Sequence, residues 1–81
     1  MDELARASLG TSRPSLQGLT PRELVILRLI SRGESNKKIA RELSISEHTV
    51  RAHVRTIMRK LEVANRVQAA TLALRNGLAV S

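Results

Sequence analysis

Apolar residues recur at helical spacing from Leu19 onward, and no segment of strand length alternates apolar and polar residues. The pattern predicts four helices: one from Pro21 to just before Gly33, then 36–43, 47–61 and 66–76. The connections between them are short, and 81 residues leave room for one small domain. The predicted fold is all-α, a compact four-helix domain that contains a helix-turn-helix.

Residues that favour the beginnings and ends of helices agree with these four helix boundaries. Thr20 is a suitable N-cap for the first helix, with Pro21 at its first position and Glu23 placed to complete a capping box. The N-caps predicted for the other three helices are Asn36, Ser46 and Asn65. Gly33 and Gly77 stand where the first and last helices should end, because glycine readily adopts a left-handed conformation.

Two apolar faces predict the core. The first helix offers Leu24, Leu27 and Ile30, with Val25 and Leu29 widening the face. At 100° per residue, four apolar residues of the third helix lie within about 60° of one another. These four residues are Val50, Val54, Ile57 and Leu61.

The opposite side of the third helix is basic. Arg51, Arg55 and Arg59 form a ladder at i, i+4 and i+8, with no acidic residue between them. Like charges at this spacing weaken an isolated helix by a few tenths of a kcal/mol per pair. Double-stranded DNA would relieve that repulsion, since it carries one negative charge per ~1.7 Å of axis.

In a helix-turn-helix the second helix enters the DNA major groove, which here is the helix at 47–61. Arginine can bond O6 and N7 of guanine together, and a small alanine lets the helix approach the bases. The residues predicted to face bases are therefore His48, Arg51, Ala52 and Arg55. Those predicted to contact the DNA backbone are Lys37, Lys38, Thr49, His53, Arg59 and Lys60.

Composition narrows the alternatives. The formal charge is +7, and the chain has no cysteine and no aromatic residue, which excludes disulfides and thiolate metal sites. His48 and His53 are five residues apart and cannot chelate one ion from the same helix. No nucleophile–base set or Gly-rich phosphate loop is present, so we expect neither an enzyme nor a cofactor. No apolar run is long enough to span a membrane, and a cytoplasmic location is expected.

Residues 1–18 differ from the rest. They are rich in Ser, Gly and Pro and show neither helical nor strand periodicity, which is typical of a flexible tail or an interdomain linker. We therefore predict the domain itself at 19–81.

The fourth helix has a broad surface of small and apolar residues. One interpretation is ordinary packing on the first helix. The other is self-association, which suits palindromic DNA because a two-fold dimer presents two reading helices. The residues predicted for that contact are Val67, Ala70, Thr71 and Leu74.

Several motifs resemble the DNA-binding domains of LuxR/FixJ/NarL-type regulators, the GerE-like helix-turn-helix group. The similar segments, in order, are Leu19-Thr20-Pro21-Arg22-Glu23, Asn36-Lys37-Lys38-Ile39-Ala40, Ser46-Glu47-His48-Thr49-Val50, His53-Val54, Lys60-Leu61 and Asn65-Arg66-Val67-Gln68-Ala69-Ala70. Sigma-factor C-terminal domains share a similar opening and turn, but they usually lack the Asn-Arg-x-x-Ala-Ala helix and are the second choice.

The resemblance implies a bacterial transcription regulator that binds double-stranded DNA as a homodimer. It places Arg51, Ala52 and Arg55 at the base-facing positions and assigns dimerisation to the fourth helix. RNA polymerase and an N-terminal receiver or sensor domain are further expected partners. The chain's only aspartate is Asp2, so a phospho-accepting receiver would lie outside it. The chain is thus either the effector fragment of a longer regulator or a small standalone member. A protein-interaction module that uses the fourth helix without reading DNA is the remaining alternative.

Overall fold

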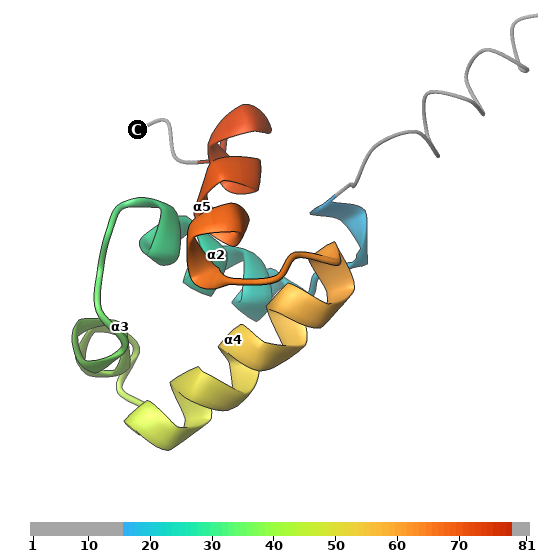
Figure 1. Cartoon of the computed structure of the whole chain (residues 1–81). Coiled ribbons are helices and arrows are strands. Elements are labelled where there is room, and N and C mark those ends of the chain that lie inside the picture. The colour runs from blue at the N-terminus through green and yellow to red at the C-terminus, as the bar shows by residue number, and fades with distance from the viewer. Residues whose placement is uncertain (1–15, 79–81) are drawn as a thin grey trace, which may run out of the picture.

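The computed structural model describes residues 16–78, and these form four α-helices after a short 3-10 turn, η1 (Leu16–Gly18). The helices are α2 (Pro21–Ser31), α3 (Asn36–Leu43), α4 (Glu47–Leu61) and α5 (Arg66–Arg75) (Figure 1). The described part of the chain contains no strand. The predicted all-α fold and all four predicted helices are confirmed.

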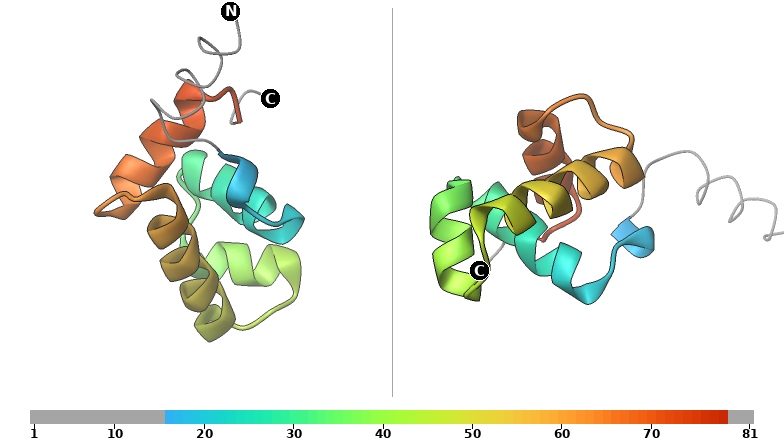
Figure 2. Two further views of the ribbon diagram at one scale, coloured as in Figure 1. Left: turned by 90° about the vertical axis from the view of Figure 1, so that its right-hand side faces the viewer. Right: turned by 90° about the horizontal axis from the view of Figure 1, so that it is seen from below.

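Helix α2 lies at the centre of the packing and contacts both α4 and α5, while α3 packs against α4. Figure 2 shows α4 running across α2, with α3 beside its first turns and α5 folded back near its last turns. The core is wholly aliphatic. Its buried members are Leu19, Ile26, Leu27, Leu29, Ile30, Ile39, Ala40, Val50, Val54, Ile57, Leu61, Ala69 and Ala73.

The face that α2 buries differs from the predicted one. Ile26 is fully buried beside Leu27, whereas Val25 is 44% exposed and points away from the core. Leu24 is only half-buried. The prediction was wrong for Val25 because four consecutive apolar residues surround more than half of the helix, and their spacing alone does not define which arc faces inward.

The helix starts follow the predicted capping chemistry with one exception. Thr20 and Glu23 form the capping box of α2, and Ser46 and Asn65 accept hydrogen bonds at the starts of α4 and α5. Helix α3 is capped by Ser35, whose Oγ accepts from Lys38 N at 3.1 Å. The prediction of Asn36 as this cap was wrong, because its side chain is engaged by α5 instead.

All four helices end in the same way: a left-handed residue is followed by an N–H that returns to a carbonyl five residues earlier. Gly33 and Gly77 take the left-handed position after α2 and α5, as predicted. Ser44 (φ 58°) and Glu62 (φ 57°) take it after α3 and α4, without being glycine. The returning bonds are Glu34 N to Leu29 O, Ile45 N to Ala40 O, Val63 N to Met58 O and Leu78 N to Ala73 O.

Most of the predicted tail, residues 1–15, lies outside the described residues. Within residues 16–18, Leu16 is half-buried against the core, and its carbonyl accepts from Leu19 N at 3.2 Å. No helix of the described segment is both long and apolar enough to cross a membrane.

Candidate nucleic-acid interface

Helix α4 separates an apolar face from a basic one. Val50, Val54, Ile57 and Leu61 are buried in the core, which confirms the predicted stripe. The residues predicted to face DNA bases, His48, Arg51, Ala52 and Arg55, are all exposed, and so is Arg59. The structure therefore brings the arginine ladder and its neighbours together on one open surface.

The ladder begins beside an acidic residue that the sequence analysis left out. Arg51 Nη1 lies 3.9 Å from Glu47 Oε1, one turn earlier on α4. Both side chains are about half exposed, and an ion pair of this length in water contributes little. Arg55 and Arg59 belong to none of the ion pairs recorded between described residues.

The start of α4 is held by Ser46. Its Oγ accepts from Thr49 N at 3.0 Å and donates to Thr49 Oγ1 at 2.9 Å. Thr49 is half-buried, and its hydroxyl already has Ser46 as a partner within the protein. This arrangement fixes the direction in which α4 leaves the turn after α3.

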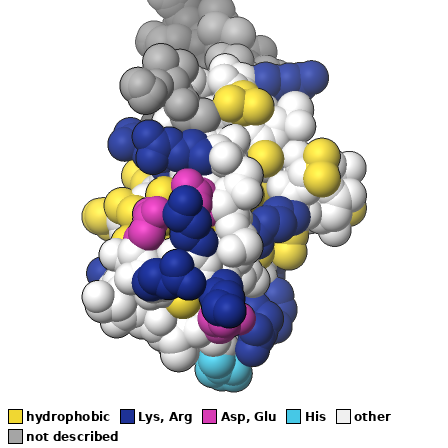
Figure 3. Space-filling view, turned by 90° about the vertical axis from the view of Figure 1, so that its left-hand side faces the viewer, with side chains coloured by type: hydrophobic (Ala, Val, Ile, Leu, Met, Phe, Trp, Pro, Cys, Tyr) yellow, Lys and Arg dark blue, Asp and Glu magenta, His cyan; other side chains and the backbone are white. Residues whose placement is uncertain are grey.

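Lysines at the start of α3 add charge beside α4. Lys37 and Lys38 are both exposed, and Lys38 Nζ lies 3.2 Å from Glu34 Oε1. Figure 3 shows the side of the molecule that carries α3, on which Lys and Arg side chains outnumber the acidic ones. A surface of this kind suits a polyanion.

Lys60 makes a contact that the sequence analysis missed. Its Nζ lies 2.8 Å from Oε1 of Glu23, a carboxylate with 7% of its side chain exposed. Burial by itself raises the pKa of Glu23, but hydrogen bonds from Lys60 and Thr20 and the charge of Lys60 outweigh it and lower the pKa. The end of α4 is thereby tied to the capping box of α2.

The two histidines differ in their exposure to solvent. His48 is exposed near the start of α4, and His53 is half-buried on its flank. Within residues 16–78 no three His, Cys, Asp or Glu side chains are grouped as metal ligands.

Helix α5 divides its residues between packing and exposure. Ala69 and Ala73 are fully buried, and their small side chains let α5 lie close to the central α2. Val67 and Leu74 are 73% and 55% exposed. Thr71 is exposed between them, and Ala70 is half-buried at the edge of the core. Packing on α2 therefore leaves the predicted dimerisation residues largely uncovered.

A half-buried arginine connects α5 to the start of α3. Arg66 donates from Nη1 to Asn36 Oδ1 and from Nη2 to the Glu34 carbonyl oxygen, both at 2.6 Å. Burial lowers the pKa of its guanidinium. This contact engages the Asn36 side chain, which does not cap α3, and it ties the first residue of α5 to the start of the helix-turn-helix.

Comparison with known proteins identifies the family. Residues 17–73 match the GerE model, described as bacterial regulatory proteins of the luxR family. The chain belongs to the luxR family. The match includes residues 65–70, on which the choice between LuxR-type and sigma-factor domains rested.

The chain is also similar to individual regulatory proteins. It is 57% identical over 54 residues to the glycerol metabolism activator of Pseudomonas putida, covering 67% of this chain and 24% of that protein. It is 46% identical over 65 residues to the nitrate/nitrite response regulator protein NarL of Escherichia coli, covering 80% of this chain and 30% of NarL. The chain thus spans less than a third of the length of these relatives.

Solved structures share the fold. A crystal structure of Escherichia coli SdiA matches with a TM-score of 0.75 and 34% identity, covering 88% of this chain and 29% of SdiA. The transcription factor GerE matches with a TM-score of 0.67 and 45% identity, covering 74% of this chain and 90% of GerE. The chain is therefore a LuxR-family helix-turn-helix domain, the DNA-binding part of transcription regulators.

Proposed function

We propose that this domain binds double-stranded DNA sequence-specifically, with α4 in the major groove and two copies on an inverted repeat. The exposed face of α4 is the observation that carries the proposal. It offers Arg51 and Arg55 on either side of the small Ala52, while the opposite face of the same helix is anchored in the core. Bidentate bonds from Arg51 and Arg55 to guanine give sequence discrimination.

Contacts to the DNA backbone complete this arrangement. Lys37, Lys38 and His53 lie beside the ladder, and Arg59 is its last member; contacts from these residues to phosphates would fix the register without reading bases. Thr49 and Lys60 have protein partners at 2.9 and 2.8 Å, so we assign them contacts to phosphate in addition to those partners.

The outward face of α5 supports pairing of two copies. Val67 and Leu74 expose apolar side chains beside Thr71, and single exposed apolar residues are common, but these share one helix face. Ala70 lies at the edge of that face. A two-fold pair formed through this surface would place two α4 helices about one turn of DNA apart.

Selection from a random duplex pool near physiological salt tests the proposal. Enrichment of an inverted repeat with half-sites about 10 base pairs apart is the expected result. Binding without any enriched motif would refute sequence-specific reading, and an enriched single half-site would refute pairing.

Two variants of α4 separate base reading from charge. Arg51→Ala should cost about 1–3 kcal/mol on the selected site and relax specificity at one base position. Arg59→Ala, the matched control on the same helix, should lower the affinity for selected and random duplexes alike. It should also reduce the salt dependence of the affinity by the contribution of about one phosphate contact. Equal losses on both duplexes for both variants would contradict the assigned roles.

We further propose that the domain acts under the control of a receiver or sensor domain located N-terminal to it. The support is the response-regulator role named for NarL, of which this chain matches 30%. Sequencing of the transcript that encodes Met1 and its upstream region tests this, because a receiver would add a phospho-accepting aspartate in the same reading frame.

A further inference from the structure

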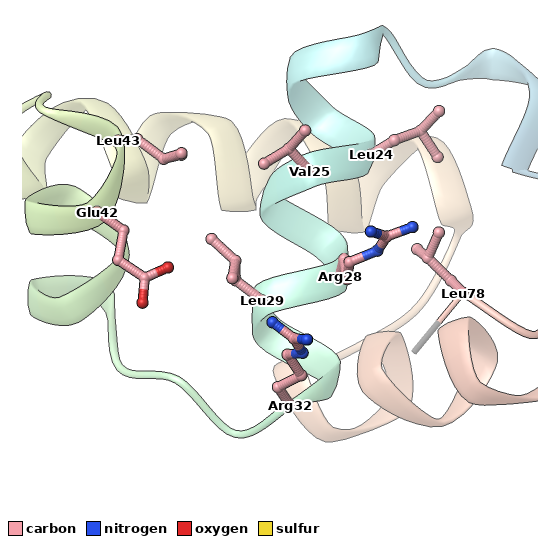
Figure 4. A pocket seen from close by; sticks show the side chains of 8 residues that line it. All are labelled: Leu24, Val25, Arg28, Leu29, Arg32, Glu42, Leu43 and Leu78. Atoms are coloured by element: carbon pink, nitrogen blue, oxygen red, sulfur yellow. The ribbon is translucent and has the colours of Figure 1, made fainter. Parts of the chain in front are cut away.

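A groove of about 420 Å³ runs along the outer side of α2, bounded by the end of α3 and by Leu78 (Figure 4). Leu24, Val25, Leu43 and Leu78 supply apolar walls. The last three come from three separate parts of the chain, so the groove is a product of the fold. Val25, at 44% exposure, contributes nothing to the core and leaves an apolar floor open to solvent.

Two arginines line the same groove. Arg28 is on α2 and Arg32 follows its last residue, four positions later, and both are exposed. The ion pairs recorded between described residues involve Lys38, Arg51 and Lys60, so neither groove arginine takes part in one. A position near the helix C-terminus favours positive charge, but the dipole does not account for the apolar walls beside it.

The groove lies away from the reading face of α4. Ile26, Leu27 and Ile30 point into the core, and Arg28 and Arg32 lie on roughly the opposite side of the helix at 100° per residue. In Figure 4, α2 lies in front of α4, and Val25, Leu29 and Arg32 project from the near side of α2. A duplex bound at α4 would therefore leave this groove open.

We propose that the groove of α2 is a docking site for an acidic amphipathic helix of a partner protein. Two guanidinium groups one turn apart match two carboxylates at i and i+4 of such a helix, and arginine–carboxylate pairs bind in bidentate fashion. Leucine or isoleucine side chains between the carboxylates would fill the apolar floor, as in other helix-in-groove complexes.

Glu42 determines the orientation of the bound helix. It lines the groove from α3, opposite the two arginines. A carboxylate of the partner facing Glu42 would be repelled, so the acidic residues must lie on the α2 side. We therefore expect a lysine or arginine, or a neutral residue, on the side of the partner that faces α3.

Selection of random 12-residue peptides displayed on their own mRNA, with the whole 81-residue chain as bait, tests this inference. The expected products carry two acidic residues at helical spacing with Leu or Ile between them. A representative synthetic peptide should lose at least tenfold in affinity for Arg28→Gln/Arg32→Gln. The control Arg22→Gln/Arg41→Gln removes the same charge from exposed residues outside the groove and should change the affinity less than twofold.

Chemical-shift changes on adding the peptide locate it independently of any variant, and they should centre on the methyl groups of Val25, Leu43 and Leu78. Three outcomes overturn the inference. One is the absence of acidic peptides from the selection, which is the result expected if the chain's own terminal residues fill the groove or if nothing binds there. Another is loss of binding only in Arg51→Gln/Arg55→Gln, which would place the peptides on α4. The third is equal loss in the groove double variant and its charge-matched control.

Discussion

The contact between Glu23 and Lys60 makes a quantitative prediction about stability. Glu23 Oε1 accepts from Thr20 N at 2.9 Å and from Lys60 Nζ at 2.8 Å, with 7% of the Glu23 side chain exposed. A hydrogen bond to a charged group contributes about 1.5–3 kcal/mol and a helix cap about 1 kcal/mol. Because 36% of the Lys60 side chain is exposed, water screens the ion pair, and its contribution lies toward the lower end of that range.

Glu23→Ala should therefore lower the free energy of unfolding by about 2–3 kcal/mol, since it removes both bonds. Glu23→Gln keeps an acceptor oxygen but loses the charge, and should cost about 1 kcal/mol. For a domain of this size each kcal/mol lowers Tm by about 4–8 °C. Circular dichroism at 222 nm, during thermal and urea unfolding, measures these differences.

A double-mutant cycle of Glu23→Gln and Lys60→Met isolates the pair. We expect a coupling energy of about 1 kcal/mol at neutral pH. The matched control is Glu34→Gln with Lys38→Met, a more exposed pair at 3.2 Å, which should couple by about 0.3–0.5 kcal/mol.

The coupling should depend on pH. The folded-state pKa of Glu23 is lowered from 4.5, so its contribution is fully present above 4.5 and disappears as pH falls through the lower folded value. A coupling near zero at neutral pH, or one that persists unchanged in strong acid, would refute the reasoning.

Three further predictions concern other contacts. Arg66→Ala should lower the free energy of unfolding in urea by about 2–3 kcal/mol, because it leaves Asn36 and the Glu34 carbonyl without their donor. Arg66→Lys should recover only part of this loss, since lysine cannot make both bonds. Wild-type stability in Arg66→Ala would contradict this prediction. Ser44→Gly should stabilise by about 0.5–1 kcal/mol, because relief of the left-handed backbone outweighs the added entropy of the unfolded chain, and a drop in Tm would show that the Ser44 side chain contributes instead. Leu74→Asp, at a 55% exposed site, should keep the wild-type Tm but abolish cooperative binding to two half-sites in a gel-shift titration, and unchanged cooperativity would exclude this face of α5 from pairing.

Local signals account for most of what the sequence predicted correctly. The capping box of Thr20 and Glu23, the caps Ser46 and Asn65 and the left-handed glycines each act within a few residues of the chain. The buried stripe of α4 could also be predicted from the sequence, because most of the residues between its four members are polar.

Long-range contacts account for what the sequence did not predict. Lys60 meets Glu23 across 37 positions, and Arg66 meets Asn36 across 30, so neither pairing has a local pattern. The outward position of Val25 depends on which side of α2 receives α4 and α5. The left-handed Ser44 and Glu62 carry no residue-type signal, since neither is Gly or Asn. The DNA-contacting and dimerisation residues stay predictions, placed on exposed faces.

The aliphatic core has a consequence for spectroscopy. Every buried hydrophobic residue between positions 16 and 78 is Leu, Ile, Val or Ala, so each one carries at least one methyl group. With no Phe, Tyr or Trp in the chain, only the imidazole rings of His48 and His53 can add a protein ring current to the resonances of these methyl groups, and the protein has almost no absorbance at 280 nm. Both histidines are on α4, so ring-current shifts that arise elsewhere in the domain when it binds DNA must come from the nucleobases. Methyl spectra of this domain would thus report the proximity of bases to each labelled side chain, with two histidine rings as the only ring contribution from the protein.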